Sequence, residues 1–592
     1  MCGIVGYCGK KISAKRILQS LKKLEYRGYD SAGISVLNNK EVTTHKQAGK
    51  IDELINSLPG NLSTTCAISH TRWATHGKAN YENAHPHSSH TALWTIVHNG
   101  IIENYKEIKS KLKHPIVSDT DTAVLAEYLE ENNAHDVTSF ISSFKDVKGS
   151  YAIAAINKNE PNTLYIAKKN SPLFICVNND EIWVASDPIS MPLEYDYLYE
   201  LLDNEFALVT DNIIFFYDTM STIIDKKPSK INETFEETNL QNYPHFMLKE
   251  IEEERNAILN QVDTYRRKNT LKYYDYDYIK RFEHIKFIGC GTAYHAGLMG
   301  ARFIEKLVGI KSSTEIASEF IYKEPILDDK NTLFIFISQS GETADTLRAL
   351  EIVKKKGLDN IALTNVLYSS IARLASHTLP TVAGPEIAVA STKAFVCQLT
   401  ALYMFACHLH NVKENNFIDY EKDIISIANN ILCFDRDKIN SIASEIYNDT
   451  TAIFLGKDLD YIIAMESSLK LKEISYINST SYPSGELKHG FLALVEEGTP
   501  LIIFATGSDI QISKTINAAH ESSARGAKEI LITNRYQNYL EHRASIYINN
   551  ENPLLAPILA IAPMQYLAYR VSVLKGYNPD QPRNLAKSVT VE

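Results

Sequence analysis

The stretch CGIVGYCG, residues 2–9, follows the initiator methionine and has the pattern of a short apolar strand interrupted by glycines. If Met1 is removed, Cys2 becomes the amino terminus and carries both a thiol and a free α-amino group. An α-amino group has a pKa of about 8, so it can act as a base and activate the thiol near neutral pH. Taken alone, Cys2 is better explained as a small apolar strand residue. The hypothesis of an amino-terminal nucleophile therefore depends on partners elsewhere in the chain.

Residues 1–219 are dominated by short apolar segments of strand length. After the first come TTCAISHTRW, ALWTIVHNGII, SYAIAAINK, TLYIAKK, EIWVASD and FALVTDNIIFFYD. Apolar residues at helical spacing interrupt them, first through Ile17 and Leu21 and then through Leu125 and Leu129. This pattern predicts an α+β domain built on sheets.

A linker and a repeated α/β pattern follow. Residues 220–256 are rich in charge, threonine and asparagine, and we expect them to form the linker. Beyond them, TLFIFISQSGETADTLRALEIVKKKGLDNIALTN is echoed by TPLIIFATGSDIQISKTINAAHESSARGAKEILITN. An apolar strand, a small polar turn, a helix and a second strand are typical of open parallel sheets. We expect related subdomains at 257–430 and 431–575 and a carboxyl-terminal tail at 576–592.

The composition is that of a globular protein in a reducing compartment. The 592 residues are 44% hydrophobic, and 61 basic against 71 acidic residues give a net charge of −10. This balance argues against nucleic acid or an anionic membrane as the main partner. The 8 cysteines include no CxxC pair, which predicts neither a zinc knuckle nor a disulfide framework. With no secretory leader and no long apolar run, we expect a cytoplasmic protein.

A thiol that attacks an amide needs an oxyanion hole. HNG, residues 98–100, ends a predicted strand, where the Asn99 amide and the Gly100 N–H can face a developing oxyanion. A simple turn at Asn99 and Gly100 is the competing interpretation.

The same domain offers groups that can hold an amino acid. In HTRWATHG, Arg72 can bind a carboxylate through two hydrogen bonds, with Thr75 and His76 beside it. In SDTDT, Asp121 can bind an ammonium group. Separately, Arg72 has the alternative of a surface charge and Asp121 that of a helix cap. Together with Cys2, they predict a pocket for a free α-amino acid such as glutamine.

These motifs resemble the glutaminase domain of class II amidotransferases, which use an amino-terminal nucleophile. The resemblance rests on CGIVG, LEYRGYDSAG (24–33), HTRWATHG (70–77), NAHPH (83–87), HNGIIEN (98–104) and TDT (120–122). It implies a four-layer αββα sandwich, Cys2 as nucleophile, and Asn99 and Gly100 as oxyanion hole. It also implies that a loop around Trp73 closes over glutamine, and that glutamine is bound by Arg72, Thr75, His76 and Asp121.

The histidines at positions 85, 87 and 90 raise the question of a metal site. Their spacing fits no standard zinc pattern. We therefore expect structural hydrogen bonds at these positions and no metal.

SQSGET, residues 338–343, follows the apolar segment TLFIFI and opens a predicted helix. Hydroxyls and exposed N–H groups at a helix amino terminus, without a Walker lysine, suit a single phosphate better than a nucleoside triphosphate. An ordinary helix cap is the alternative. GCGTAYHAG does not favour NAD, because Tyr294 stands where the dinucleotide motif requires glycine.

The second half resembles tandem sugar-isomerase (SIS) domains, and the whole chain resembles the family of glutamine:fructose-6-phosphate aminotransferases, the glucosamine-6-phosphate synthases. The most specific segments are SQSGETADT, VASTKAF (389–395), LKLKEISYI (469–477), GELKHG (485–490) and DQPRNLAKSVTVE (580–592). The resemblance implies two Rossmann-like α/β subdomains. It also implies the amination and isomerisation of fructose 6-phosphate to glucosamine 6-phosphate, with ammonia channelled from Cys2.

The same resemblance assigns roles at the sugar site. His489 from a neighbouring subunit opens the ring, and Lys587 forms a Schiff base with the open ketose, although a solvated tail charge is the alternative for Lys587. Glu473 moves a proton between C1 and C2, with Lys470 near it at helical spacing. The phosphate is held by Ser338, Gln339, Ser340 and Thr343, and the sugar is touched by Thr292, Val389 and Ala586.

The chain departs from the family pattern in three places. Ala293 stands where a second small hydroxyl is usual, so one phosphate contact is in doubt. Phe491 replaces a usual proline, which puts the backbone after His489 in doubt. Glu253-Glu254-Arg255 replaces a proline-containing hinge.

The sequence therefore predicts a dimeric, cofactor-independent enzyme of hexosamine synthesis, with glutamine and fructose 6-phosphate as substrates. Other amidotransferases should show a phosphoribosyl-pyrophosphate loop or an SGGxDS loop, and neither occurs. A sugar-phosphate sensor would not need Cys2, Glu473, His489 and Lys587 together. An aminotransferase of the same architecture acting on a modified sugar phosphate stays open.

Overall fold

The computed structural model describes residues 2–73, 77–192, 195–210, 212–228, 239–323, 331–414, 416–535 and 544–590. It divides into two compact units, residues 1–237 with 586–592 and residues 238–585. Within the described ranges, every helix is too short or too polar to cross a lipid bilayer.

The described part of the first unit contains two seven-stranded antiparallel sheets. The first has the order β11-β9-β10-β1-β4-β2-β3 and the second the order β14-β13-β12-β8-β7-β6-β5. Strands of the first sheet are β1 Gly3–Ser13, β2 Ser31–Asn38, β3 Glu41–Ala48, β4 Ser63–Arg72, β9 Phe174–Asn178, β10 Glu181–Ala185 and β11 Tyr197–Glu200. Strands of the second are β5 His87–Ser88, β6 Trp94–Ile102, β7 Gly149–Asn157, β8 Thr163–Lys169, β12 Glu205–Thr210, β13 Ile213–Tyr217 and β14 Ile223–Ile224.

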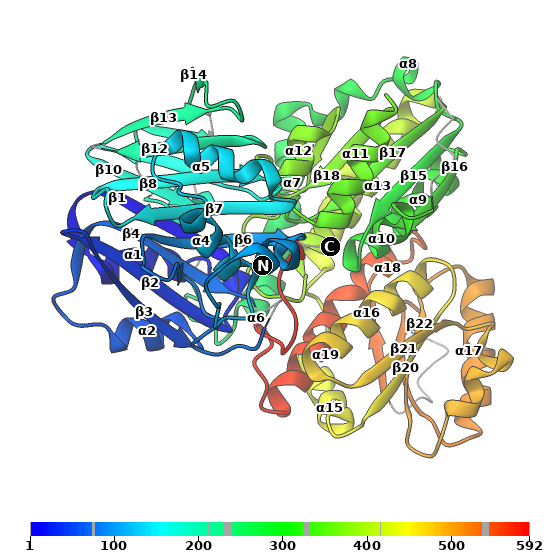
Figure 1. Ribbon diagram of the computed structural model, residues 1–592. Helices are drawn as coiled ribbons and strands as arrows, with labels where there is room; N and C mark the ends of the chain where they lie inside the picture. Colours follow the sequence, from blue (N-terminus) through cyan, green and yellow to red (C-terminus); the bar gives the residue numbers. More distant parts are fainter. Residues whose placement is uncertain are drawn as a thin grey trace. The chain divides into compact units, whose positions relative to one another are not determined.

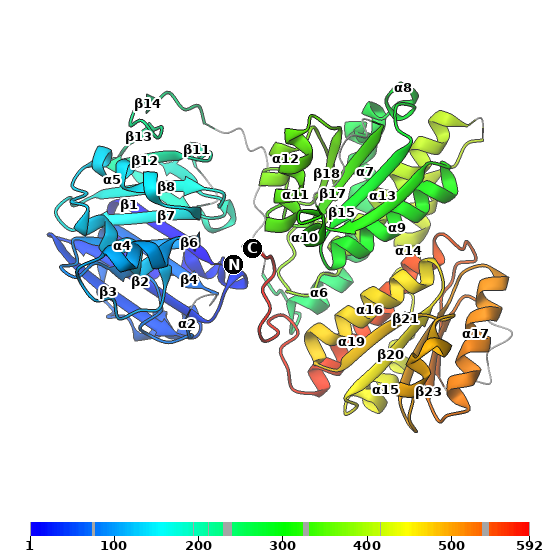
Figure 2. The same ribbon diagram turned by 45° about the vertical axis from the view of Figure 1, so that its right-hand side comes forward.

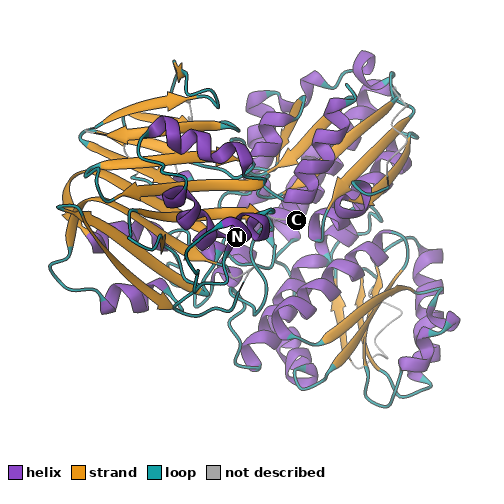
Figure 3. Ribbon diagram, in the orientation of Figure 1, coloured by secondary structure: helices purple, strands orange, loops and turns teal. Residues whose placement is uncertain are grey.

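Helices cover the outer faces of both sheets, so the first unit has four layers (Figures 1 and 3). On the first sheet lie α1 Ala14–Lys22 and α2 Ile51–Ser57. Near the second lie α3 Tyr105–Lys111, α4 Asp121–Glu131 and α5 Val137–Ser143. The predicted αββα sandwich is confirmed.

The alternation along β7 explains why its sheet is buried on both faces. Ala152, Ala154 and Ile156 belong to the core between the sheets. Tyr151 and Ile153 belong to the core under α4 and α5. Successive strand side chains point to opposite faces, so one apolar strand supplies both cores.

The register of β1 and β4 places Cys2 beside Arg72. Gly3 pairs with Thr71 in this antiparallel ladder, so the first residues of β1 lie next to the end of β4. A Cβ atom at Gly3 would lie 2.7 Å from Leu24 Cβ and 2.8 Å from Thr71 Cγ2, too close for any other residue. Because Gly3 has no side chain, the first residues of the chain can pack closely against Leu24 and Thr71.

The described part of the second unit contains two five-stranded parallel sheets with the same strand order, which confirms the predicted α/β repeat. The first, β16-β15-β17-β18-β19, comprises β15 His284–Gly289, β16 Lys311–Ile316, β17 Thr332–Ser338, β18 Asn360–Thr364 and β19 His377–Pro380. The second, β21-β20-β22-β23-β24, comprises β20 Thr451–Gly456, β21 Asn478–Pro483, β22 Pro500–Ala505, β23 Lys528–Thr533 and β24 Ala544–Tyr547.

Helices lie on both faces of each parallel sheet, and Figure 2 shows α17 on one side of the second sheet with α16 and α19 on the other. The helices up to the second sheet are α6 Phe246–Glu252, α7 Glu254–Lys268, α8 Tyr276–Ile279, α9 Thr292–Leu307, α10 Ala317–Phe320, α11 Ala344–Lys355, α12 Ser370–Leu374, α13 Lys393–Lys413, α14 Tyr420–Asn430 and α15 Arg436–Ile446. The others are α16 Leu459–Ser475, α17 Asp509–Ser523, α18 Ala556–Leu559 and α19 Ile561–Leu574. One apolar core joins the two subdomains through residues such as Phe395, Leu402, Ile463 and Leu567.

Candidate active sites

Cys2 lies directly before β1 and contacts the residue after β4. The amide N–H of Trp73 points to Cys2 Sγ at 3.4 Å, and Sγ lies 3.6 Å from the Trp73 carbonyl oxygen. Burial raises the pKa of the Cys2 thiol, against the opposing effects of the chain's amino-terminal charge and Arg72. The thiol therefore needs a base to become a nucleophile, which fits activation by a terminal amine.

Asn99 is held with its amide nitrogen toward Cys2. Asn99 Nδ2 donates to the Cys2 carbonyl oxygen at 3.1 Å, and its Oδ1 lies 3.1 Å from His70 Nε2. The next residue, Gly100, has a φ of +131°. A Cβ atom at Gly100 would lie 2.1 Å from the Ser150 carbonyl oxygen, so the strand admits only glycine here. The proposed oxyanion donors are thus fixed by β6 and its neighbours.

Arg72 and Asp121 place a cation and an anion near the thiol. Burial lowers the pKa of Arg72, while Cys2, Asp30 and Asp121 act in the opposite direction. The carboxylate of Asp121 accepts hydrogen bonds from the amides of Ile102 at 2.8 Å and of its neighbour Thr122 at 3.0 Å. Opposite charges around a thiol suit the carboxylate and ammonium groups of one amino acid.

The cap of α4 is Thr120, because its Oγ1 accepts from the Ala123 amide at 3.3 Å. The simple capping interpretation of Asp121 is therefore wrong, and its carboxylate instead tethers α4 to β6. Thr75 and His76 lie outside the described residues.

His70 is a residue of this site that the sequence arguments missed. It lies two positions before Arg72 on β4, and period-two alternation places the two on the same face of the strand. This two-residue spacing from Arg72 could have indicated from the sequence that His70 lies at the same site.

The three adjacent histidines separate into two environments. His85 and His87 are buried with ring centroids 4.8 Å apart, and burial lowers the pKa of both. His87 Nε2 lies 3.0 Å from Thr120 Oγ1, a contact within the fold. His90 is half-exposed and contacts Glu127 on α4.

In the second unit, the predicted phosphate residues follow β17 and precede α11. Ser338 Oγ lies 2.9 Å from Thr343 Oγ1 and accepts from the Gly341 amide at 3.0 Å. The Ser340 hydroxyl accepts from the Glu342 amide at 3.2 Å. Gly341 has a φ of +68°, and a Cβ atom there would lie 1.9 Å from Ser369 Oγ. This tight turn brings the hydroxyls together at the start of a 12-residue helix.

Gln339 lies in the same turn, and its carbonyl oxygen accepts from the Asn365 amide at 3.1 Å. That bond ties the turn to the chain that follows β18.

A buried charged network joins α9 to α16. Lys470 Nζ lies 3.3 Å from Glu466 Oε1 and 2.7 Å from Glu473 Oε2. Glu466 also accepts from the Thr292 hydroxyl at 2.9 Å, and its other oxygen lies 2.7 Å from His295 Nδ1. The predicted residues Thr292, Lys470 and Glu473 are therefore brought together, with Glu466 and His295 as partners that sequence reasoning missed.

Lys470 is held as a cation by this network. Burial alone would lower the pKa of Lys470, but the carboxylates of Glu466 and Glu473 outweigh it and raise that pKa. An ammonium group that stays protonated orients carboxylates and does not attack a carbonyl. One face of α16 carries Glu466, Lys470 and Glu473. The spacing of four residues between Glu466 and Lys470 could therefore have predicted from the sequence that Glu466 contacts Lys470.

In the second subdomain, the turn after β22 corresponds to the turn at residues 338–343, the predicted phosphate site of the first subdomain. There, the buried carboxylate of Asp460 accepts from the amides of Thr506 at 2.8 Å and Gly507 at 3.1 Å. Burial raises the pKa of Asp460 to about 6, against these hydrogen bonds.

The remaining predicted sugar-site residues lie on loops and on the tail. His489 is exposed at the end of the short 3-10 helix Leu487–His489. The Val389 amide donates to the Asp580 carbonyl oxygen at 3.1 Å. Ala586 and Lys587 are half-buried in the segment 586–592, which groups with the first unit.

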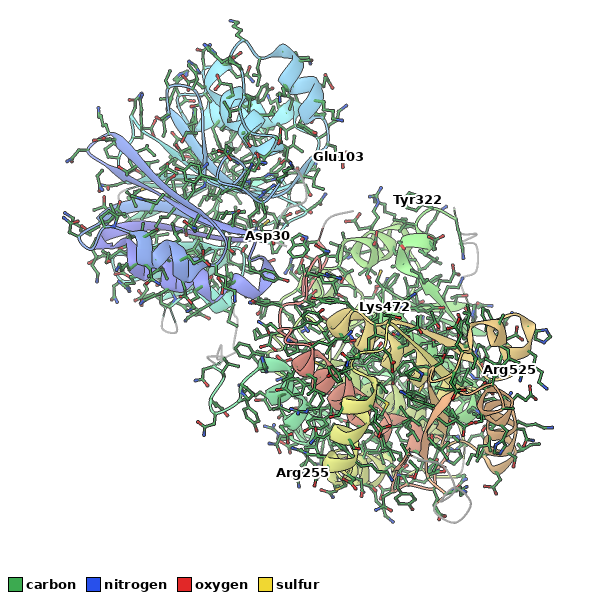
Figure 4. All side chains as sticks on the ribbon, turned by 90° about the horizontal axis from the view of Figure 1, so that it is seen from below. Asp30, Glu103, Arg255, Tyr322, Lys472 and Arg525 are labelled. Carbon is green, nitrogen blue, oxygen red and sulfur yellow. The ribbon has the colours of Figure 1, made fainter. Side chains whose placement is uncertain are left out.

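The structure shows where the residues that depart from the family pattern lie. Ala293 lies in the first turn of α9. The Phe491 ring stacks on Tyr482 with centroids 3.7 Å apart. Glu253 is the cap residue between α6 and α7 and pairs with Lys393 at 2.7 Å. Glu254 is fully buried, and Arg255 is exposed on α7 (Figure 4).

Comparison with known domain families separates the two halves of the chain. Residues 70–191 match the glutamine amidotransferase domain family, and residues 278–407 and 445–575 match the SIS domain family. The chain is thus a glutamine amidotransferase joined to a pair of SIS domains.

Full-length relatives define the family more closely. The chain is 42% identical to the glutamine--fructose-6-phosphate aminotransferase (isomerizing) of Clostridium tetani and 39% identical to that of Shouchella clausii. In both comparisons all of this chain and all of the relative are covered. The chain belongs to the glutamine--fructose-6-phosphate aminotransferase (isomerizing) family.

Solved structures resemble the second half. The C-terminal domain of glucosamine-fructose-6-phosphate aminotransferase from Francisella tularensis matches with 35% identity and a TM-score of 0.53 over 58% of this chain and 100% of that one. A putative tagatose-6-phosphate ketose/aldose isomerase from Clostridium novyi matches with 17% identity and a TM-score of 0.52, covering 58% of this chain and 93% of that one. The second similarity shows the fold alone.

Proposed function

We propose that this protein transfers the amide nitrogen of glutamine to fructose 6-phosphate and isomerises the product to glucosamine 6-phosphate. The observation that carries the proposal is the arrangement around Cys2, where Asn99 Nδ2 donates to the Cys2 carbonyl oxygen and Arg72 ends the neighbouring strand. Membership of the aminotransferase family supports the acceptor.

In the first step, the α-amino group of Cys2 takes the thiol proton, and the sulfur attacks the glutamine side-chain amide. The Asn99 amide and the Gly100 N–H stabilise the oxyanion, and the C–N bond breaks as ammonia leaves with that proton. Water then hydrolyses the thioester, which releases glutamate and restores the thiol. Glutamine is held by Arg72, Trp73, Thr75, His76 and Asp121.

In the second step, ammonia passes internally to the sugar phosphate. Ser338, Gln339, Ser340 and Thr343 hold the phosphate, while Thr292, Val389 and Ala586 contact the sugar. His489 of the partner subunit opens the ring, and Lys587 forms a Schiff base with the C2 carbonyl. Ammonia displaces the lysine, and Glu473 transfers a proton from C1 to C2 to give the 2-amino aldose.

In the buried network of α9 and α16, Lys470 pairs with Glu473, and Glu466 holds Lys470 in place. Lys470 is buried and lies 2.7 Å from the Glu473 carboxylate, so this ion pair fixes the orientation of that carboxylate. A carboxylate held in a fixed position can accept a proton from a neighbouring carbon atom.

The proposal includes a homodimer in the cytoplasm that needs neither metal nor cofactor for this reaction. It keeps the division into a glutaminase domain at 1–219, a linker at 220–256, SIS subdomains at 257–430 and 431–575, and a tail at 576–592.

The test is to incubate the untagged protein with glutamine and fructose 6-phosphate and to measure glutamate and glucosamine 6-phosphate. We expect equal amounts of both products. Cys2→Ala should abolish synthesis from glutamine and retain synthesis from ammonium chloride. Glutamate release without an aminated sugar would contradict the proposed acceptor. Trp73→Ala should release glutamate faster than aminated sugar, and unchanged coupling would remove Trp73 from the passage.

A further inference from the structure

We propose that His90, His114 and Glu127 form a binding site for a divalent transition-metal ion in the first unit. Each offers one ligand atom, and these atoms all lie within 4.8 Å of one another. The site shares no residue with the glutamine pocket around Cys2. It extends the chemistry of this chain beyond the proposed aminotransferase reaction.

The Glu127 carboxylate is fixed before any ion binds. Glu127 lies on α4 and is 4% exposed, and its Oε2 accepts from the His90 amide at 2.8 Å. Its Oε1 lies 2.6 Å from His90 Nδ1 and 3.3 Å from His114 Nδ1. One carboxylate oxygen is therefore directed at both imidazoles, while the other is anchored by the backbone.

Two further glutamates form an outer layer. Glu130 Oε1 lies 3.4 Å from His90 Nε2 and accepts from the Thr91 hydroxyl at 2.7 Å. When Nδ1 of His90 binds a metal, its proton sits on Nε2 and faces this carboxylate. A ligating histidine that donates its other ring N–H to a carboxylate is the usual supporting arrangement.

Glu131 holds the second histidine. Its Oε1 accepts from the His114 amide at 3.0 Å and lies 3.0 Å from His114 Nδ1. Glu131 therefore positions the His114 side chain from outside the set of three ligands. The carboxylates of Glu127, Glu130 and Glu131 also give the site the negative charge that offsets a dication.

The chemistry of the three ligand side chains indicates which metal ions the site would bind. Two imidazoles and one carboxylate are ligands that zinc uses, and imidazole favours zinc, copper and nickel over magnesium and calcium. The rings of His90 and His114 are stacked with centroids 3.7 Å apart, and their side chains are 34% and 44% exposed. Solvent therefore reaches both rings, and each can turn to direct its lone pair at the ion.

The three ligands come from separate parts of the first unit. His90 follows β5, His114 follows α3, and Glu127 is in the middle of α4. An ion bound to all three would tie two loops to α4, the helix that begins with Asp121. Metal binding should therefore stabilise the first unit without entering the reaction.

The test is a titration of the full-length, untagged protein with Co²⁺ as the probe, followed by absorption spectroscopy. We expect one Co²⁺ per chain, visible bands, and no thiolate charge-transfer band. His90→Gln and His114→Gln should each weaken binding by more than about tenfold. The matched control His135→Gln removes an exposed histidine of the same unit and should bind like the unaltered protein.

Thermal unfolding gives a second measurement. Added Zn²⁺ should raise the midpoint temperature at which the first unit unfolds in the unaltered protein and in His135→Gln. It should not raise this temperature in His90→Gln or His114→Gln. Glutaminase activity should be the same in all variants. Absence of Co²⁺ binding, binding unaffected by both histidine variants, or a thiolate band would overturn the proposal.

Discussion

His70 Nε2 lies 3.1 Å from Asn99 Oδ1 and 3.0 Å from the His98 carbonyl oxygen. A carbonyl oxygen can only accept, so His70 carries its proton on Nε2 and donates it. Asn99 must therefore present its oxygen to His70 and its Nδ2 to Cys2, where Nδ2 lies 3.1 Å from the carbonyl oxygen. The direction of the proposed oxyanion donor is set by a histidine on another strand.

Replacing Asn99 by alanine should remove the donor. We expect Asn99→Ala to lower kcat for glutamine hydrolysis by about 10²–10³-fold and to change KM little, because the oxyanion forms only in the transition state. Synthesis from ammonium chloride serves as the control and should be unaffected. A variant with a raised KM and a normal kcat would assign Asn99 to substrate binding instead.

His70 should act through Asn99 as a positioning residue. We expect His70→Ala to lower kcat for glutamine hydrolysis by roughly tenfold at unchanged KM, since Asn99 stays but loses its fixed orientation. His70→Gln keeps an N–H donor and should recover part of the rate. If both variants lost activity equally with the same loss of thermal stability, a purely structural role would explain them.

The buried histidines should make the first unit sensitive to mild acid. Burial lowers the pKa of His70 to about 3 and also lowers the pKa of His85 and His87. A histidine is protonated near pH 6.5 in the unfolded chain, so unfolding takes up protons as the pH falls below that value. Folding stability should therefore decrease between pH 7 and pH 5.5, as measured by urea unfolding. His87→Gln should reduce this slope, and a flat profile would be inconsistent with neutral buried histidines.

Glu473→Gln should separate the two half-reactions. The amide cannot accept the C1 proton, so formation of glucosamine 6-phosphate should fall by about 10²–10⁴-fold. Glutaminase activity of the same preparation is the internal control. Retention of full synthesis would exclude Glu473 as the proton-transfer group.

Glu254→Gln should stabilise the second unit at alkaline pH. Burial raises the pKa of Glu254, although Gln565 opposes the shift, so the folded chain keeps its proton to a higher pH than the unfolded chain. Stability is then lost as pH rises above about 4.3, the carboxyl pKa of the unfolded chain. The variant should exceed the unaltered protein in urea-unfolding free energy at pH 8, with a smaller difference at pH 5.

The matched control for this prediction is Glu252→Gln. Glu252 pairs with the half-exposed Arg436 at 2.7 Å, so its removal should cost less than about 1 kcal/mol. An equal gain at pH 5 and pH 8 in Glu254→Gln would indicate a packing effect unrelated to ionisation.

The fold could be predicted largely because its patterns are local. The continuous apolar run of β7 and the strand–turn–helix repeat at Thr332 and Thr499 each lie within a short stretch of chain. The same holds for Cys2, Asn99 and Asp121, which stand in contiguous motifs.

What the sequence did not reveal is made by packing between distant segments. Glu466 meets Thr292 and His295 only because α16 packs on α9 across two subdomains. Likewise, His90 and His114 share the Glu127 carboxylate through the folding of two loops onto α4. Spacing along the chain carries no information on such contacts, and the spacing of His85, His87 and His90 had argued against a metal.

The hydrogen bonds of Asp460 give the duplicated architecture an asymmetry. The turn after β17 in the first subdomain is the proposed phosphate site, whereas the corresponding turn after β22 in the second subdomain binds a carboxylate of its own chain. Asp460 is in the first turn of α16, the helix that also carries Lys470 and Glu473. The Asp460 carboxylate therefore links this turn to the start of α16 and restricts the rotation of that helix, and with it the direction of Lys470 and Glu473, the residues proposed for the sugar site.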